Sequence, residues 1–367
     1  MFTRRQVLAT APLVMAGCRR PPPETRPTGF CFVANRAGRN LAAVDLGVFS
    51  VAKRIPLEAE PAQVLAHPRR PLVYALTPAD GQLIEVSAVK LAISRRAAMA
   101  PGASAMRWSH DRRALWVLAG QQLLQVDPER LAVVGRIALP GVPTDIDFSP
   151  EAPEAAASIA ATGEIVVIDL AGRRITRTIK LGSAGPLRIL KKQILAGQPA
   201  ERVLTLLDAA SGDAIVHLPL AVRPDRFCFS ADGGQLFING EGADAVVVVY
   251  PYQSEVAATL LAGRKPGVMA ATARPAYLFV ANPLSNSVTV IDTQTQRVIG
   301  AVPVGEQPSH IEITPDQAYA LVLNRASGDL SVLWTQAFSK IGRRERTGPM
   351  FLMVPVGSDP VSAAIAG

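Results

Sequence analysis

A repeat of about forty residues runs through most of the chain and constrains its fold more than any other feature. The clearest copy contains three strand-like stretches, YLFVAN at 277–282, SVTVID at 287–292 and RVIGAVPVG at 297–305. The stretches 32–35 (FVAN) and 41–45 (LAAVD) repeat its first two parts near the N-terminus. Short apolar stretches separated by Gly, Pro, Asp and Asn are typical of β-strands joined by tight turns.

The end of the third strand gives a measure of the repeat length. It falls every 39 to 42 residues, at Asp45, Glu85, Asp127, Asp169, Asp208, Tyr250, Asp292 and Trp334. A proline precedes the first strand of most units, at Pro61, Pro101, Pro143, Pro186, Pro224, Pro266 and Pro308. Units of this length and pattern predict an all-β propeller of four-stranded blades, with eight blades.

The two ends of the repeat complement each other. Residues 29–57 supply three strands without a first one, and residues 360–365 supply a first strand alone. We expect them to join and close the ring, which removes exposed sheet edges. Seven blades are the alternative, with the unit from Pro186 degraded, because residues 187–192 alternate poorly.

The sequence pattern formed by Phe-Val-Ala-Asn, Val-Thr-Val-Ile-Asp and Val-Pro-Val-Gly resembles the YVTN propeller repeat of bacterial surface and periplasmic proteins. It is also similar to the propellers of lactonase-like proteins and of haem d1 domains. The resemblance covers the chain after residue 28 and implies the fold, whereas such relatives perform different functions on one scaffold.

The N-terminus resembles a lipoprotein export signal. Arg4 and Arg5 precede the short apolar stretch 7–16, which ends at Met15-Ala16-Gly17-Cys18. We therefore expect a signal peptide over 1–17, lipidation of Cys18, a Pro/Arg-rich tether over 18–28 and the propeller over 29–367. The arginine pair is compatible with twin-arginine or general export. Arg19, rather than Asp, after the lipidated residue favours the outer over the inner membrane of the cell envelope.

Composition excludes other classes of protein. The net charge of +8 is spread over every segment and aromatic residues are 5%, so we expect no nucleic-acid binding. Cys31 and Cys228 are each flanked by Phe and fall in separate blades, which indicates buried apolar residues rather than a disulfide.

Propellers commonly bind ligands at the mouth of the central channel. If the prolines mark where the chain enters the innermost strands, the residues two positions later line this mouth: Gln63, Ala103, Asp145, Arg188, Arg226, Val268, His310 and Ser362. Asp147 and Glu312 lie two residues further on the same side of their strands. Such a set suits a polar or anionic ligand. In the interpretation we favour, these charges pair with one another and remain solvated.

No residue pattern indicates catalysis or a resident cofactor. The chain lacks a nucleophile elbow, a phosphate-binding glycine loop, a His-Glu-x-x-His motif and a haem-attachment motif. His310 is the best single functional candidate, whereas His67, His110 and His217 fall in turns or an outer strand. The insertion 341–348 is basic and is interpreted as a solvated loop.

The leading hypothesis is a non-enzymatic, lipid-anchored propeller. It would bind an envelope protein or a small polar ligand, and would touch the membrane only through its lipid. One alternative is a lactonase-like hydrolase with a metal ion on Asp145, Asp147 and Glu312. The other is a haem d1-type redox propeller in which His310 serves as an axial ligand.

Overall fold

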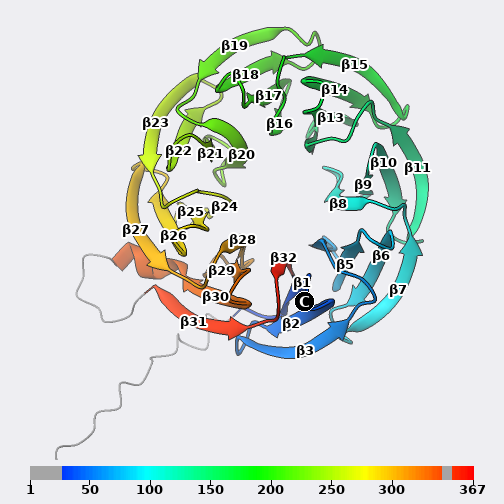
Figure 1. Ribbon diagram of the computed structural model, residues 1–367, viewed down its shortest axis with the longest axis vertical. Helices are drawn as coiled ribbons and strands as arrows, with labels where there is room; N and C mark the ends of the chain where they lie inside the picture. The colour runs from blue at the N-terminus through cyan, green and yellow to red at the C-terminus, as the bar shows by residue number, and fades with distance from the viewer. Residues whose placement is uncertain (1–26, 341–348) are drawn as a thin grey trace, which may run out of the picture.

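A computed structural model describes residues 27–340 and 349–367, and these form a ring of eight four-stranded antiparallel sheets around a central channel (Figure 1). Each sheet is one blade, and in seven of them the strands run from the channel outwards in chain order, whereas the first blade has β32 as its innermost strand. The expectation of an eight-bladed all-β propeller is confirmed. The segment 1–26, which includes the expected signal and Cys18, and the insertion 341–348 lie outside the described residues.

The blades are numbered from the N-terminus. The innermost strands of blades 1 to 8 are β32 (Pro360–Ala366), β4 (Gln63–Ala66), β8 (Ala103–Trp108), β12 (Asp145–Phe148), β16 (Leu187–Leu190), β20 (Arg223–Phe229), β24 (Met269–Ala271) and β28 (Pro308–Ile313). The second strands are β1 (Phe30–Asn35), β5 (Leu72–Thr77), β9 (Leu115–Ala119), β13 (Glu154–Ile159), β17 (Gln193–Gln198), β21 (Leu236–Glu241), β25 (Tyr277–Asn282) and β29 (Tyr319–Asn324).

The third strands are β2 (Asn40–Asp45), β6 (Gln82–Ser87), β10 (Gln122–Asp127), β14 (Glu164–Asp169), β18 (Val203–Asp208), β22 (Ala245–Tyr250), β26 (Ser287–Asp292) and β30 (Asp329–Trp334). The outer strands are β3 (Ser50–Pro56), β7 (Ala92–Ala98), β11 (Ala132–Ala138), β15 (Arg174–Lys180), β19 (Ala214–Pro219), β23 (Glu255–Leu261), β27 (Arg297–Pro303) and β31 (Met350–Pro355). A short 3₁₀ helix, η2 (Thr335–Lys340), follows β30. Within the described ranges no helix is long and apolar enough to cross a membrane.

Blade 1 closes the ring as the sequence predicted. Its innermost strand, β32, pairs antiparallel with β1, and the register runs from Phe30 opposite Ala366 to Asn35 opposite Pro360. The last strand of the chain therefore completes the first blade. Both strands also pack into the apolar layers on either side of blade 1, which contain Val33 and Ala363 on one side and Phe32 and Ala364 on the other.

The burial of each strand follows from its place in the blade. Neighbouring blades stack face to face, so both faces of the second and third strands lie in an apolar layer, and all six residues of β25 and β29 are buried. Outer strands meet solvent, and β15 alternates exposed positions with partly or fully buried ones. This explains why the second and third strands are nearly continuous apolar runs, whereas the outer strands alternate.

The acidic residue that ends the third strand stabilises the turn into the outer strand. The carboxylate of Asp127 accepts hydrogen bonds from the N–H groups of Glu129 and Arg130, and Asp292 does the same for the two turn residues that follow it. An Asp side chain that holds the backbone two and three residues ahead favours this tight turn. The spacing of these aspartates thus has a structural cause.

The predicted end of the third strand is wrong by two residues in blade 2. There the third strand ends at Ser87, whose Oγ accepts a hydrogen bond from the N–H of Lys90. Glu85 is instead buried in the middle of β6, where it pairs with Arg95. Arg95 also donates to the carbonyl of Glu129, 2.7 Å away in blade 3, so this pair links two blades.

Candidate channel-mouth site

We call the face where the chain enters the innermost strands the mouth face, and the opposite one the turn face. Four expected residues lie at one level near the mouth face, because each pairs with the fifth residue of its second strand: Gln63, Asp145, His310 and Ser362. Arg226 takes the corresponding place in β20, opposite Asn239. The structure thus places these side chains around one ring, while their binding of a ligand stays a prediction.

Two positions in the expected ring are displaced by two residues. In β8 the register shifts between Ala103 and Ala105, so Ala105 is the counterpart of Asp145. In blade 5 the carbonyl of Pro186 accepts a hydrogen bond from the N–H of Gly197, which makes Pro186 the counterpart. Arg188 therefore lies two residues further along its strand than Asp145 does on its own strand, and so deeper in the channel.

Asp145 joins three neighbouring blades. Its Oδ1 lies 3.0 Å from Nη2 of Arg107 in blade 3, and its Oδ2 lies 2.7 Å from Nη1 of Arg188 in blade 5. The backbone N–H groups of Ile146 and Leu187 also donate to this carboxylate, at 2.9 and 3.2 Å. All four contacts compensate a carboxylate whose side chain is only 16% exposed. Arg107, which the sequence interpretation missed, is thus part of the site.

Asp147 lies deeper than Asp145 on the same strand. Its Oδ2 accepts a hydrogen bond of 2.9 Å from the N–H of Ile189, and its Oδ1 lies 3.8 Å from Nη1 of Arg107. Burial raises the pKa of this carboxyl above its ordinary value, although Arg188 and Arg107 oppose that shift. The effect of desolvation on this pKa therefore outweighs that of the two nearby arginines.

The uncharged members of the ring connect neighbouring innermost strands. The side-chain amide of Gln63 bonds both the N–H and the carbonyl of Met106 in the next blade, at 2.6 and 3.1 Å. The hydroxyl of Ser362 accepts a hydrogen bond of 3.2 Å from the N–H of Val64. Asp145 and Arg188 are thus the expected mouth charges that pair with each other, whereas Gln63 and Ser362 bond the backbone of the neighbouring blade.

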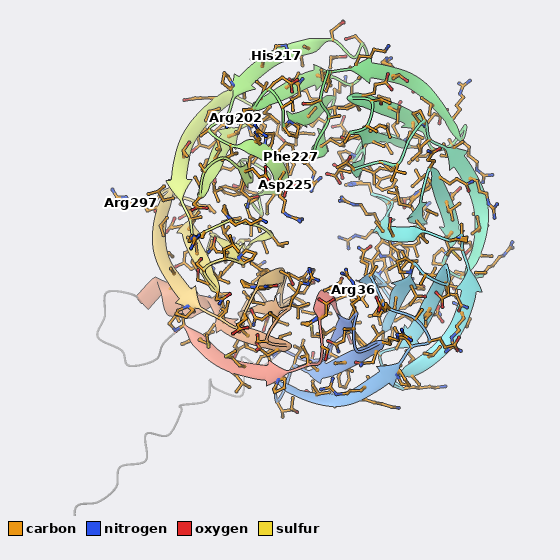
Figure 2. All side chains as sticks on the ribbon, in the orientation of Figure 1. Arg36, Arg202, His217, Asp225, Phe227 and Arg297 are labelled. Carbon is orange, nitrogen blue, oxygen red and sulfur yellow. The ribbon has the colours of Figure 1, made fainter. Side chains whose placement is uncertain are left out.

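A hollow of about 510 Å³ nevertheless opens beside Asp145 at the mouth face. Arg107, Arg188 and Arg226 reach it from three different blades, and Phe227 and Met269 add apolar surface. Asp225 and Phe227 lie at the inner edge of the ring, whereas Arg297 lies on the outer rim (Figure 2). A second hollow of about 970 Å³ continues over blades 5 to 7 and shares Asp225 with the first.

Arg226 is the least compensated of the three arginines. Its Nε lies 3.6 Å from Oδ2 of the adjacent Asp225, and both side chains are more than half exposed. Arg188, by contrast, donates to Asp145 and to the carbonyls of Leu187 and Phe227. Arg226 therefore keeps most of its hydrogen-bonding capacity for a ligand.

His310 and Glu312 lie across the channel from this cluster. They belong to β28 of blade 8, which in a ring of eight is opposite blade 4, and Figure 1 shows β28 across the channel from β13. His310 Nε2 lies 3.5 Å from Oε2 of Glu312 and has no hydrogen-bond partner among the described residues.

The proposed metal site is therefore not assembled. Asp145 and Asp147 lie in blade 4, whereas Glu312 lies in blade 8, so the three carboxylates cannot share one ion. In the part of the chain that the structure describes, no three His, Cys, Asp or Glu side chains are grouped suitably for a metal ion. The expected grouping is wrong because equal places in different blades are related by rotation around the channel and need not be close.

Both described cysteines are free thiols. Cys31 is fully buried, and burial raises its pKa far above the ordinary value. Cys228 is half-buried in β20, and burial raises its pKa to about 11, although Arg188 lowers it somewhat. Their interpretation as unpaired residues is confirmed.

Comparisons with known proteins support the fold. No family model and no curated protein matches the sequence. The structure is similar to that of dihydro-heme d1 dehydrogenase NirN, solved in complex with DHE, with a TM-score of 0.76 over 93% of this chain and 77% of the other, at 15% identity. It is also similar to hydrazine synthase of Kuenenia stuttgartiensis, with a TM-score of 0.58 over 88% and 99% of the two chains, at 16% identity.

At these identities the likeness shows an all-β propeller and nothing finer. The YVTN resemblance therefore stays an interpretation of the repeat itself.

Proposed function

We propose that the protein is a non-enzymatic binding propeller of the cell envelope, anchored by lipidated Cys18, and that it binds a small anionic organic ligand at its channel mouth. The observation that carries this proposal is the convergence of Arg107, Arg188 and Arg226 on one hollow of about 510 Å³. Pockets of this size that combine apolar walls with a few converging polar groups commonly hold small ligands.

The three arginines have different tasks in this proposal. Arg188 is fixed by Asp145 and two backbone carbonyls, so it provides a rigid wall. Arg107 is 40% exposed and Arg226 is 53% exposed, and both present N–H groups to the hollow. A guanidinium group offers a planar pair of donors that matches a carboxylate, so a ligand with at least one carboxylate suits the site.

A thermal-melt titration of the full chain with citrate tests the proposal. A ligand that binds only the folded state raises the melting temperature by an amount that grows with the logarithm of its concentration above the dissociation constant. We expect a citrate-dependent rise in melting temperature that Arg226→Gln abolishes and that Arg297→Gln, an outer-rim control for the loss of one positive charge, preserves. Equal stabilisation of both variants would refute binding at the channel mouth.

A second candidate ligand is a tetrapyrrole of the haem d1 type. Two observations favour it: the likeness to NirN, whose structure contains DHE, and the imidazole of His310 in the mouth ring. His310 Nε2 has no hydrogen-bond partner among the described residues, and the arginines across the channel suit the carboxylates of such a ring. If an iron tetrapyrrole bound here, it would supply redox chemistry, and His310 and Arg226 would hold its iron and a carboxylate respectively.

Absorption spectroscopy distinguishes the two candidates. Ferric protoporphyrin added to the protein should give a shifted Soret band that His310→Ala removes, if the tetrapyrrole alternative holds. Stabilisation by citrate with no specific spectral change would leave the small anion as the ligand class.

A further inference from the structure

The turn between the innermost and the second strand of a blade, which we call the first turn, has a common form in six blades. Its first residue donates its backbone N–H to the carbonyl five residues later, as His67 does to Leu72 at 2.9 Å. In five of these blades the first residue carries a hydroxyl group: Ser109, Ser149, Ser230, Thr272 and Thr314. Blade 2 has a histidine at this position instead. Among these six residues, only His67 can change its charge near neutral pH.

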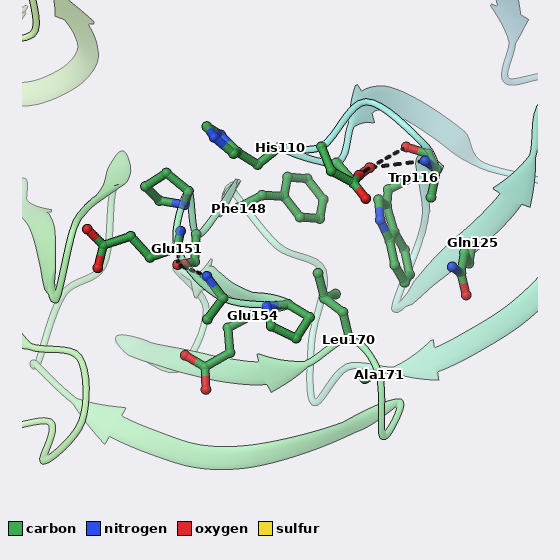
Figure 3. Close-up of a pocket in the computed structure, with 15 residues that line it drawn as sticks. His110, Trp116, Gln125, Phe148, Glu151, Glu154, Leu170 and Ala171 are labelled. Carbon is green, nitrogen blue, oxygen red and sulfur yellow. Dashed lines mark hydrogen bonds between the residues drawn. The ribbon is translucent and has the colours of Figure 1, made fainter.

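The hydroxyl groups stabilise their turns by accepting hydrogen bonds from backbone N–H groups. Oγ of Ser149 accepts from Glu151 and Ala152, two and three residues ahead, at 3.3 and 3.2 Å (Figure 3). The other four hydroxyls accept from the N–H five residues ahead, which belongs to Ala114, Gln235, Tyr277 or Tyr319. A hydroxyl keeps its acceptor lone pairs whatever the pH, so these bonds do not depend on protonation.

The imidazole ring of His67 performs the same task in blade 2. Its Nδ1 accepts hydrogen bonds from the N–H groups of Arg69 and Arg70, both at 3.0 Å, which is the arrangement that Ser149 has in blade 4. The ring lies edge-on to the indole of Trp108, with 5.3 Å between the centroids, and this contact fixes its orientation. Nδ1 is an acceptor only while it carries no proton, so the closed turn requires the neutral ring.

The surroundings of His67 also favour the neutral ring. Burial lowers the pKa of His67 below its ordinary value. Of the charged groups that face it, two lower this pKa and two raise it, namely Arg70 and Arg69 of its own turn against Glu129 of blade 3 and Glu85 of β6. Tyr74 of β5, whose ring lies 6.3 Å away, is uncharged because burial raises its pKa. A lowered folded-state pKa stabilises the closed turn above the unfolded pKa, about 6.5 for His, and this contribution is lost as pH falls.

The first turn of blade 2 is also connected to blade 3. Nη1 of Arg70 lies 2.7 Å from Oε2 of Glu129, which belongs to the turn after β10. Arg95 of β7 donates to the backbone carbonyl of the same Glu129, so the two blades have a second link that does not involve His67. A change in the first turn therefore alters the turn face without detaching the blades.

We propose that His67 makes this part of the turn face sensitive to acid. The neutral ring closes the first turn of blade 2, and a proton on Nδ1 opens it, because the new N–H group then faces two backbone N–H groups. The opened turn displaces Arg70 from Glu129. Arg69 and Arg70 are exposed, so water replaces the lost hydrogen bonds and the opening is local. The turn is closed at neutral pH and opens progressively as pH falls below about 6.5.

Amide hydrogen exchange of the full chain at about pH 7.5 and about pH 5, corrected for the intrinsic effect of pH, tests this inference. The N–H groups of Arg69 and Arg70 report directly, because they donate to the ring. We expect their protection to fall by more than about threefold at the lower pH. The N–H groups of Glu151 and Ala152 are the control within the same molecule, and their protection should not change because a hydroxyl holds them.

Two variants separate His67 from the other titrating groups. His67→Ser gives blade 2 the side chain that Ser149 provides in blade 4, so the turn should stay closed and its protection should no longer depend on pH. His110→Ser removes an exposed histidine from the first turn of blade 3 and should leave the effect intact (Figure 3). Equal pH dependence of the two turns in the unmodified protein, an unchanged effect in His67→Ser, or its loss in His110→Ser would overturn the proposal.

Urea unfolding gives a second measurement that does not depend on exchange rates. The unfolded chain binds a proton on His67 more readily than the folded chain does, because the folded-state pKa is lowered. Between about pH 7.5 and about pH 5, the folding equilibrium constant of the unmodified protein should therefore fall at least about threefold relative to that of His67→Ser. A ratio that is independent of pH contradicts the proposal. If His67→Ser does not fold, the comparison of the two turns in the unmodified protein decides.

Discussion

Replacement of Asp145 by Asn tests whether the channel-mouth cluster holds blades 3, 4 and 5 together. The carboxylate accepts from two arginines and two backbone N–H groups, and an amide has only one oxygen. If that oxygen faces Arg188 and Leu187, the amide N–H₂ group must face Arg107 and the N–H of Ile146, which are donors. The substitution therefore removes the charge and also places donors against donors.

The cost follows from the exposure of each partner. Arg188 is 21% exposed and keeps a hydrogen bond to the amide oxygen, but loss of the negative charge beside so buried a guanidinium costs about 2 kcal/mol. Arg107 is 40% exposed, so solvent screens its pair and the loss is below about 1 kcal/mol. The unpaired N–H of Ile146 adds about 1 kcal/mol. We expect a destabilisation of about 3 kcal/mol, which for a propeller of this size lowers the melting temperature by about 4 °C.

Thermal melts monitored by circular dichroism measure this effect. Asp225→Asn is the matched control, because Asp225 lines the same hollow, is 68% exposed and, among the described residues, pairs only with its neighbour Arg226 at 3.6 Å. We expect the control to melt within about 1 °C of the unchanged protein. If Asp145→Asn also melts within that margin, the cluster contributes nothing to inter-blade cohesion, and the reasoning is refuted.

Three further results are expected. Burial raises the folded-state pKa of Asp147, so its contribution to stability is present below the unfolded pKa and is lost as pH rises through the folded pKa. Asp147→Asn should therefore be more stable than the unchanged protein at pH 7. Urea titrations should show this difference shrinking toward about pH 4. In a Cys18→Ser background, Cys31 and Cys228 should not react with Ellman's reagent at pH 8 until the protein is denatured, because burial raises both pKa values; rapid reaction of the native protein would contradict the structure. Ala364→Glu buries a charge in the closing strand and should lower stability by more than about 3 kcal/mol, whereas Ala138→Glu, at an exposed outer-strand position, should change it by less than about 0.5 kcal/mol.

The ring could be predicted because its repeated residues have local tasks. An aspartate at the end of a third strand is required by the turn directly after it, as at Asp127 and Asp292, so its spacing survives where the apolar pattern has drifted. The single strand 360–365 could be assigned to blade 1 because three strands near the N-terminus lacked an innermost partner. Both inferences depend on neighbours in sequence or on counting strands.

The site was predicted less well because its contacts join different blades. The number of residues between each proline and its strand varies, and β8 contains a register shift, so a fixed offset of two residues selected Ala103 in place of Ala105. Arg107 is two residues after the corrected position and could have been found only with that shift known. The separation of Glu312 from Asp145 depends on the angle between blades, which a linear repeat does not contain.

The pairing of β32 with β1 also determines when the protein can finish folding. Residues 30–35 are synthesised before the other seven blades, whereas their innermost partner, residues 360–366, is synthesised after all of them. The other seven blades each consist of strands consecutive in sequence and can form as the chain emerges. Closure is thus a single long-range step whose loop contains the other seven blades, and until it occurs β1 remains an open edge available to other chains.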